Sequence, residues 1–523
     1  MAINDKIKPF LVLVLFFAIF FMAHWSINGL ATADDPYYHA KHAFLMEQSG
    51  QFNLVRPWLE FHFFNYAPTD IWWGYHLGAA FFIHWFGLLL GIKVFASFLA
   101  ALVFAVFYLI LNSLKVKYPF IWVFFLLVSS TVFSFRLSLE RPHLLSIIVL
   151  PLAFLFLAKG RNFWLFILSL FYTLSYHLAP LIILQTLVYS AVEAYTKKRI
   201  NLRPLIASAG GILAGALIHP QSLNYFYIMF ITHSQILFLK FFGVDLNIGS
   251  ELQMPGFADF IRSNFLVLLA GILATVLFLS LKKLGKTSVV GNFLFLYSNT
   301  WLIVSLLVWR GVEYWLPITF LFAAVTFSDF MAREEFKQVK NWLANKINLK
   351  ILSFFLFGAL TAVIFYNLST VFLDFFQAGT ETAGLSENYS QANEWLKANT
   401  KKDSVIFYSS WSMWPMMFFY NDYNHYITGI DPTFLYEYDQ RTYWLWRNIS
   451  YDGLYCDQPT PCLNLKPAEQ IKLVPLAIKR DFLAKYAVVL NDEASNLIRT
   501  LNNLRAEVKL VFKNKDLLIY EIK

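Results

Sequence analysis

Long apolar segments recur along most of this chain and are separated by short polar stretches. Their lengths approach the ~20 residues that an α-helix needs to cross the hydrocarbon core of a bilayer. The pattern predicts eleven membrane-spanning helices, near residues 10–30, 93–112, 119–135, 144–158, 162–178, 180–195, 204–218, 264–281, 289–308, 314–330 and 351–372. We therefore expect a polytopic α-helical membrane protein.

Two further apolar stretches, residues 71–90 and 223–242, do not fit as crossings. Counting the first as a crossing would move three basic loops to the other side of the membrane. We predict re-entrant or interfacial helices for both, and the indole rings of Trp72, Trp73 and Trp85 in the first suit a membrane interface. If both stretches do cross, the number of crossings rises to thirteen.

Composition and charge agree with this class of protein. Of the 523 residues, 58% are hydrophobic and only 14% are charged, which excludes a soluble fold for most of the chain. The formal net charge of +9 arises from short basic clusters between apolar segments, such as residues 197–203 and 333–350. By the positive-inside rule these clusters are cytoplasmic, and they require no nucleic-acid partner. We expect a cytoplasmic N-terminus, a retained first helix and the plasma membrane of a prokaryote.

The pattern changes beyond Leu373, where the apolar runs become short. Residues 374–523 have the size of one compact domain. Short apolar runs predict strands at 405–408, 425–428, 486–490, 508–512 and 517–522, with helices at 390–398 and 493–504. An odd number of crossings places this α/β domain outside the cytoplasm. Residues 1–373 then form the transmembrane domain, with long outer loops at 31–92 and 219–263.

Both cysteines of the chain, Cys456 and Cys462, lie in the predicted outer domain. No second pair of metal-ligating residues accompanies them, so a local disulfide is favoured over a metal site. A disulfide agrees with an oxidising, extracytoplasmic location.

Ionisable residues gather at the predicted outer surface of the membrane domain, where proximity to hydrocarbon makes them functional candidates. They are Asp34, Asp35, His39, Lys41, Glu140, Arg141, His143, His177, His219, Asp245, Glu251, Arg310 and Glu313. Carboxylates from three loops suit Mg²⁺ or Mn²⁺, and a guanidinium group pairs with phosphate. The sequence therefore predicts a divalent-metal and phosphate site on this side.

Three short motifs occur in order on the same predicted side. They are Asp35-Pro36-Tyr37-Tyr38-His39-Ala40-Lys41, Gly249-Ser250-Glu251-Leu252-Gln253-Met254-Pro255, and Arg310 placed seven residues before Pro317. They resemble the first external loop, the later Ser-Glu loop and the phosphate-contacting arginine of the catalytic subunit of oligosaccharyltransferase. The chain is thus similar to the GT-C superfamily of membrane glycosyltransferases, whose fold joins transmembrane helices to an extracytoplasmic domain.

The chain departs from that family at two places. The second external loop of the family carries several acidic residues. In this chain the corresponding residues 136–143 contain one acidic residue, Glu140. The segment with Trp411 and Trp414 resembles the stretch leading to the family's Trp-Trp-Asp-Tyr-Gly acceptor motif but lacks its aspartate. The outer domain is also short for an oligosaccharyltransferase. The resemblance therefore implies a relative with another acceptor.

The resemblance implies a hexosyltransferase acting on the extracytoplasmic side. It would move a sugar or oligosaccharide from a polyprenyl-phosphate or polyprenyl-pyrophosphate carrier to a protein, glycan or lipid acceptor. Direct displacement by analogy with the family implies inversion at the anomeric carbon.

Residue roles follow from the same resemblance. The implied catalytic residues are Asp35, as general base or metal ligand, and Glu251 and Glu140. The implied donor-phosphate ligands are Arg310, His39 and Lys41. The candidate ligands for Mn²⁺ or Mg²⁺ are Asp34, Asp35, Glu140, His143 and Glu251. The candidate sugar or acceptor groove consists of Tyr37, Tyr38, Trp411 and Trp414.

Several alternatives stay open at the level of sequence. Histidine ligands could replace the missing carboxylates, or the reaction could be metal-independent, with His and Arg holding the phosphate. A transporter or lipid flippase would place ionisable residues at mid-membrane and show internal repeats. A non-catalytic scaffold would tolerate alanine at Asp35, Glu251 and Arg310.

Overall fold

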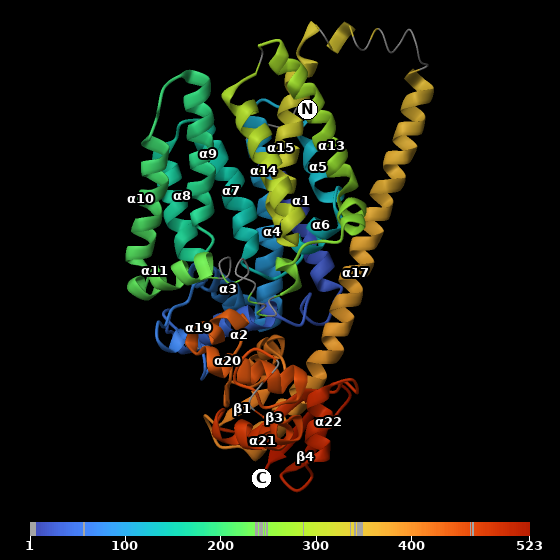
Figure 1. The fold of residues 1–523 in the computed structure, drawn as a ribbon. Helices are drawn as coiled ribbons and strands as arrows, with labels where there is room; N and C mark the ends of the chain where they lie inside the picture. Colours follow the sequence, from blue (N-terminus) through green and yellow to red (C-terminus); the bar gives the residue numbers. More distant parts are fainter. Residues whose placement is uncertain are drawn as a thin grey trace. The chain divides into compact units, whose positions relative to one another are not determined.

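The computed structural model of this chain describes residues 7–55, 58–235, 239, 244, 246, 249–285, 287–334, 336–338, 341, 349–460, 462 and 465–523. The chain forms two compact units, each assembled from separate stretches (Figure 1). The first unit comprises Met1–Ser26, Lys93–Ile218 and Ser250–Gln377, and the second comprises Ile27–Ile92, His219–Gly249 and Ala378–Lys523. Most of the two predicted outer loops therefore group with the C-terminal segment. Asp245 lies outside the described residues.

The first unit is built almost entirely of helices. They are α1 (Lys8–Trp25), α4 (Leu88–Ser113), α5 (Pro119–Val128), α6 (Thr131–Leu137), α7 (His143–Ala158), α8 (Asn162–Ser175), α9 (Pro180–Lys197), α10 (Arg203–Ile218), α13 (Phe257–Lys283), α14 (Val289–Leu307), α15 (Val312–Met331) and the first half of α17 (Leu349–Asn399), with short turns η3 (Ser250–Leu252) and η4 (Trp309–Gly311). Every predicted span coincides with one of these helices or with a helix pair.

Apolar helices make this chain an integral membrane protein. Among the described residues, six helices are long and apolar enough to cross a bilayer, and a bent pair could supply a seventh. They are α1, α4, α13, α14, α15 together with η4, and α17. Helices α7, α8 and α10 are apolar but shorter. Only 6% of the apolar window of α17 is buried in protein, against 83% for α4, so α17 offers its side chains to lipid while α4 is enclosed.

The predicted span at 119–135 is broken in the middle. Helices α5 and α6 meet at an angle of 93° across Ser129 and Ser130. Ser130 caps α6 by accepting a hydrogen bond from the Phe133 N–H, and its hydroxyl donates to Asn264 Oδ1 at 2.7 Å. Asn264 itself marks a kink in α13, with φ −126° and ψ 20°. Side chains that cap a helix end compete with a continuous helix, which explains the break.

Helix α15 forms the centre of the first unit. Its residues from Val312 to Thr326 are all buried, and it packs against α13, α14, α7, α5 and α6. A helix that is enclosed on all sides holds its polar residues in a fixed environment, because they must find partners within the protein. The functional residues near the start of α15 are placed by this packing.

The second unit combines helices with a mixed sheet. Its elements are α2 (Asp35–Ser49), η1 (Phe63–Asn65), α3 (Trp73–Phe86), α11 (Ser222–Phe230), the π-helix η2 (Ile231–Gln235), the second half of α17, β1 (Val405–Tyr408), η5 (Trp411–Met413), α18 (Trp414–Tyr420), β2 (His425–Tyr426), α19 (Pro432–Tyr438), α20 (Gln440–Arg447), the π-helix η6 (Asn448–Asp452), α21 (Pro467–Arg480), β3 (Ala484–Leu490), α22 (Asn496–Asn503), β4 (Val508–Lys513) and β5 (Leu517–Ile522). Helix α3 covers most of the first predicted re-entrant stretch. Helix α11 and η2 cover the start of the second, whose remainder lies largely outside the described residues.

The sheet has the strand order β2-β1-β3-β5-β4. Strand β1 runs parallel to β2 and β3, whereas β5 runs antiparallel to β3 and β4. All five predicted strands are present. The outer loop extends the sheet at β2, where Tyr426 donates to the Trp58 carbonyl at 2.9 Å and Glu60 donates to the Tyr426 carbonyl at 2.8 Å. This pairing explains why the loop belongs to the same unit as the C-terminal segment.

Cys456 and Cys462 form a disulfide with a Cα–Cα distance of 5.9 Å. The Asn448 amide donates to the carbonyls of Cys456 and Gln458, at 2.8 and 2.9 Å, and so ties the same loop to η6. The bond therefore closes a short loop that already has an anchor.

Replacing both cysteines by serine is expected to lower the free energy of unfolding of the second unit by about 2 kcal/mol, because a short closed loop removes little entropy from the unfolded chain. Chemical unfolding in detergent, monitored on the purified protein, measures the change. Wild-type protein treated with a reductant is the control and should show the same loss. Equal stability of reduced and oxidised wild-type protein would contradict the expectation.

Candidate functional site

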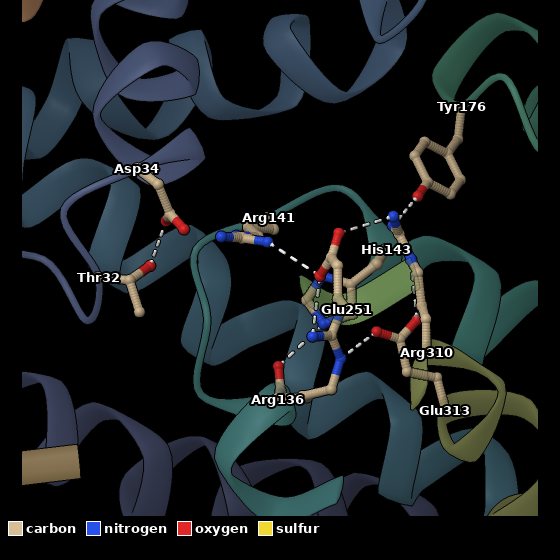
Figure 2. A network of polar contacts seen from close by, with 9 residues as sticks. All are labelled: Thr32, Asp34, Arg136, Arg141, His143, Tyr176, Glu251, Arg310 and Glu313. Atoms are coloured by element: carbon tan, nitrogen blue, oxygen red, sulfur yellow. Dashed lines mark hydrogen bonds and ion pairs between the residues drawn. The ribbon is translucent and has the colours of Figure 1, made fainter. Parts of the chain in front are cut away.

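Three arginines surround one carboxylate in the first unit (Figure 2). Arg136 lies on α6, Arg141 lies in the following loop, and Arg310 lies in η4. Glu251, in η3, accepts from Arg136 Nη1 and Arg141 Nη1 through Oε2, at 3.0 and 3.4 Å, and from Arg310 Nη1 through Oε1, at 3.1 Å. Residues separated by more than 170 positions in sequence thus meet at one carboxylate.

A second carboxylate, that of Glu313, contacts two of the same arginines. Glu313, in the first turn of α15, is fully buried and is paired with Arg136 Nε. Its Oε2 lies 3.7 Å from Arg310 Nε. Three guanidinium groups face two carboxylates, so the cluster of Arg136, Arg141, Arg310, Glu251 and Glu313 has one formal positive charge in excess. We call these five residues the arginine cluster.

The segment between α6 and α7 folds back on itself to present its arginines. Helix α7 starts at His143, directly after Pro142, whose ring suits the start of a helix. The His143 ring donates from Nε2 to the carbonyl oxygen of Arg136 at 2.9 Å. This bond adds a donor to a carbonyl at the end of α6 that also accepts from the Leu139 N–H at 3.2 Å. His143 therefore positions Arg136 and is not free to bind a metal through Nε2.

Arg310 is held by the turn between α14 and α15. The Trp309 N–H donates to the Gln253 carbonyl at 2.9 Å, which ties the turn to the segment carrying Glu251. A Cβ atom on Gly311 would lie only 2.8 Å from backbone atoms of Ser305, so glycine allows the turn to approach the end of α14. The close approach fixes Arg310 and Glu251 in one local structure.

The guanidinium group of Arg310 contacts three side chains. Its Nη1 bonds to Glu251, its Nη2 donates to the hydroxyl of Tyr176 at 2.6 Å, and its Nε lies 3.7 Å from Glu313, beyond hydrogen-bond distance. Arg136 Nη2 is likewise buried and has no hydrogen-bond partner among the described residues. A buried N–H donor of a charged group without an acceptor is costly. An anion bound at this place would remove that cost.

The electrostatics of Glu251 reflect its three arginine neighbours. Burial by itself would raise the pKa of Glu251, but the charges of Arg310, Arg136 and Arg141 outweigh burial and hold the pKa well below its usual range. A carboxylate with so low a pKa is a poor general base. Its chemical contribution is to hold the guanidinium groups together.

Glu140 occupies a different environment from Glu251. It is fully buried, and its Oε1 lies 3.4 Å from Nε2 of His24 on α1. The same His24 nitrogen lies 3.0 Å from the Ser138 carbonyl, which the ring can donate to. Within the first unit, Glu140, His143 and Glu251 therefore each have separate partners and do not form a set of metal ligands.

A small cavity lies beside Glu313, between α7, α14 and α15, and offers about 10 Å³ of space to the centre of a water molecule. Its lining is mostly aromatic and aliphatic: Ser146, Ile147, Leu150, Pro151, Tyr297, Trp301, Tyr314, Pro317 and Ile318. A single water molecule needs about 10–15 Å³ of such space. The cavity is too small to hold a sugar.

Apart from His177, which lies in the first unit, the other described ionic candidates from the sequence lie in the second unit. Asp34 precedes α2 and accepts from the Thr32 hydroxyl at 2.6 Å, and Asp35 is the first residue of that helix. Lys41 Nζ lies 3.5 Å from Asp422 Oδ1. His39 shares a hydrogen bond of 2.9 Å between its Nδ1 and His76 Nε2. Lys41 and His39 thus have partners within their own unit.

The predicted aromatic groove is mostly buried. Tyr37 packs against Phe419, and the rings of Tyr38 and Trp414 lie 4.8 Å apart between their centroids. These three side chains are at most 4% exposed. Only Trp411, at the start of η5, is partly exposed.

A histidine and aspartate group of the second unit was not singled out from the sequence. His42, Asp70 and His76 are buried and close enough together to hold a metal ion. They are spread over residues 42–76 without the regular spacing of a metal motif. The spacing of His39 and His42 on α2, three residues apart, was the one available signal, since such residues share a helix face.

The fold and the helices define the class of this protein: it is an integral membrane protein with the GT-C glycosyltransferase fold. No family model and no curated protein sequence matches the chain. The chain is similar in fold to several solved structures.

Three solved structures illustrate the likeness. The oligosaccharyltransferase of Archaeoglobus fulgidus superposes with a TM-score of 0.61 at 12% identity, over 93% of this chain and 70% of that one. ArnT from Cupriavidus metallidurans superposes with a TM-score of 0.54 at 12% identity, over 99% and 98%. The mycobacterial arabinofuranosyltransferase AftD superposes with a TM-score of 0.50 at 11% identity, over 100% of this chain and 40% of that one.

Proposed function

We propose that this protein transfers a sugar or oligosaccharide from a polyprenyl-phosphate or polyprenyl-pyrophosphate carrier to an acceptor on the extracytoplasmic side of a prokaryotic plasma membrane. The observation that carries the proposal is the arginine cluster, which holds three guanidinium groups together and leaves a buried N–H donor of Arg136 without a hydrogen-bond partner in the part of the chain that the structure describes. Arginine pairs with phosphate through two parallel hydrogen bonds.

The leaving group of such a reaction is a lipid phosphate or pyrophosphate. Charge develops on its oxygens as the bond to the anomeric carbon breaks, and fixed positive donors stabilise that charge most when they need not reorganise. Arg310 and Arg136 would supply these donors. Glu251 and Glu313 would act as positioning residues, because their carboxylates hold the guanidinium groups in place before the donor binds.

Structures with the same fold support a lipid-linked donor. ArnT has been solved bound to undecaprenyl phosphate, and the Archaeoglobus fulgidus enzyme has been solved with dolichol-phosphate and an inhibitory peptide. The Archaeoglobus enzyme has also been captured with a tethered acceptor peptide containing the sequence NVT. The acceptor of the present protein is proposed only as a protein, glycan or lipid, because this chain lacks the aspartate of the acceptor motif.

The acceptor must lose a proton as it attacks, so a carboxylate within hydrogen-bond reach of it is required. We assign this role to Asp35, or alternatively propose that Asp34 and Asp35 bind Mn²⁺ or Mg²⁺ through their carboxylate oxygens, which suit such ions. Trp411 is the one residue of the predicted groove that is available to line it. The two carboxylates are adjacent at the start of α2.

The proposal is tested by incubating the purified protein with radiolabelled polyprenyl-phosphate and polyprenyl-pyrophosphate sugars, with and without Mn²⁺. We expect release of sugar from one carrier, and a loss of at least about 10²-fold in the Asp35→Ala variant because the general base or metal ligand is absent. Asp259→Ala is the matched control, because Asp259 is exposed and pairs with the exposed Arg262.

Equal turnover by the Asp35→Ala variant would remove Asp35 from the mechanism. No release from any carrier by the folded wild-type protein, with bound donor detected but not consumed, would favour a flippase or scaffold. Dependence of turnover on Mn²⁺ would decide between the two roles assigned to Asp35.

A further inference from the structure

The second unit contains a buried group of ligand-type side chains that the transfer reaction does not use. His42 lies on α2, Asp70 lies just before α3, and His76 lies on α3. One nitrogen of each imidazole and one oxygen of Asp70 all lie within 4.8 Å of one another. Asp70 Oδ2 is 2.7 Å from His76 Nδ1 and 3.5 Å from His42 Nε2.

These separations are close to those between the ligands of a zinc ion. Zn–N and Zn–O bonds of roughly 2.0–2.1 Å in a tetrahedral site place neighbouring ligand atoms about 3.3 Å apart. The two distances to Asp70 Oδ2 lie on either side of that value, and one nitrogen of each imidazole lies within 4.8 Å of the other. Zinc would replace the hydrogen bond between Asp70 and His76 and draw the His42 ring closer.

The backbone fixes Asp70 independently of any metal. Its Oδ1 accepts from the Trp72 N–H at 3.0 Å, and its carbonyl accepts from the Trp73 N–H at 3.2 Å, so Asp70 forms the turn that leads into α3. The other oxygen, Oδ2, contacts Nδ1 of His76, in the first turn of that helix. The turn and the start of α3 thus place a carboxylate oxygen and an imidazole nitrogen side by side.

Neighbouring groups orient the ligands in the way that second-shell groups do in metal sites. His39 contacts the second ring nitrogen of His76, with 2.9 Å between His39 Nδ1 and His76 Nε2. The carbonyl of Asp70 accepts from His219 Nε2 at 3.1 Å. His42 and His76 are stacked, with 4.3 Å between ring centroids. Each ligand is therefore held by at least one further contact.

The hydrogen bonds of His42 leave one of its nitrogens available to a metal. His42 Nε2 donates to the Leu54 carbonyl at 3.1 Å, and His42 Nδ1 is buried without a hydrogen-bond partner among the described residues. A neutral imidazole that donates from one nitrogen carries an unprotonated lone pair on the other, as a metal ligand must.

We propose that His42, Asp70 and His76 bind one Zn²⁺ ion that ties α2 to α3 within the second unit. Two imidazoles and a carboxylate suit zinc better than Mg²⁺ or Ca²⁺, which prefer all-oxygen sites. The three side chains are at most 3% exposed, so the ion would be enclosed by protein, and its fourth tetrahedral position would be left to a water molecule. The site serves the stability of the second unit and does not depend on the proposed function.

The test is the metal content of the full-length protein, purified in detergent without chelator and measured by mass spectrometry of the elements. We expect close to one zinc per chain in wild-type protein and almost none in the Asp70→Asn variant. His39→Ala removes only an orienting contact and should weaken zinc affinity about 10- to 100-fold. His84→Ala is the control on the same helix, because His84 is exposed and pairs with Glu47; it should keep its zinc.

A second measurement does not require a variant to fold. Removing zinc from wild-type protein with a chelator should lower the midpoint of thermal unfolding, and adding Zn²⁺ should restore it. Substitution by Co²⁺ should give the visible absorption bands of a tetrahedral nitrogen and oxygen site. Zinc-free wild-type protein that neither binds added Zn²⁺ nor changes its unfolding midpoint would overturn the proposal, and so would stoichiometric iron in place of zinc.

Discussion

Replacing Arg310 by alanine is expected to reduce sugar release from the lipid carrier by about 10²–10³-fold, the usual effect of removing one fixed donor from a developing negative charge. Arg310 contacts Glu251, Tyr176 and Glu313, so its guanidinium group is already oriented before the donor binds. The loss should therefore appear mainly in kcat. Turnover of the radiolabelled carrier by purified protein measures it.

Two further variants separate charge from geometry. Arg310→Lys keeps the positive charge but cannot form a planar pair of hydrogen bonds, so we expect it to rescue little activity. Arg262→Ala removes an exposed arginine whose partner is Asp259, and should leave turnover unchanged. If Arg310→Ala retained turnover within about threefold of wild type, the arginine cluster would not be the phosphate site.

Replacing Glu313 by glutamine is expected to lower the free energy of unfolding of the first unit by about 3 kcal/mol. Glu313 is fully buried and its partner Arg136 has a side chain only 8% exposed, so loss of the carboxylate leaves a guanidinium charge inside the protein. Arg136 keeps its contact with Glu251, which places the effect at the lower end of the usual range. Chemical unfolding in detergent measures it.

The matched control is Glu334→Gln. Glu334 pairs with Lys337 on the surface, with both side chains largely exposed, and its loss should change the free energy by no more than about 0.5 kcal/mol. Combining Arg136→Met with Glu313→Gln removes both charges and should recover a large part of the loss. A single variant as stable as wild type would show that the buried pair does not stabilise the first unit.

The sequence alone was sufficient to predict much of the architecture. Each apolar segment is long enough to specify a helix by itself, because burial in lipid requires all backbone groups to bond within the segment. The strands at 405–408 and 517–522 were predicted at the bounds seen in the structure, since short β-branched and aromatic runs specify strands locally. Helices α18 to α21 were not predicted, because their apolar residues do not repeat at helical spacing over a long stretch of sequence.

Parts of the arginine cluster were also visible in the sequence. Arg310 and Glu251 were predicted as site residues on opposite sides of α13 and α14, and Arg141 and Glu313 were among the outer polar residues. Arg136 was given no role, because an arginine at the end of an apolar segment has the pattern of a basic loop. The break between α5 and α6, which turns Arg136 inward, depends on Ser130 and Asn264 meeting from distant parts of the chain.

The sequence by itself determined the class of membrane protein, the position of the apolar helices and the strands of the C-terminal segment, since these depend on residues close together in the chain. Only the tertiary structure decided which charged groups meet. It showed Glu251 paired with three arginines, Glu140 paired with His24, and His42 grouped with Asp70 and His76. Pairing of buried charges depends on which helix ends and turns come together in the fold. A local sequence pattern does not predict these contacts, because the residues are far apart in the chain.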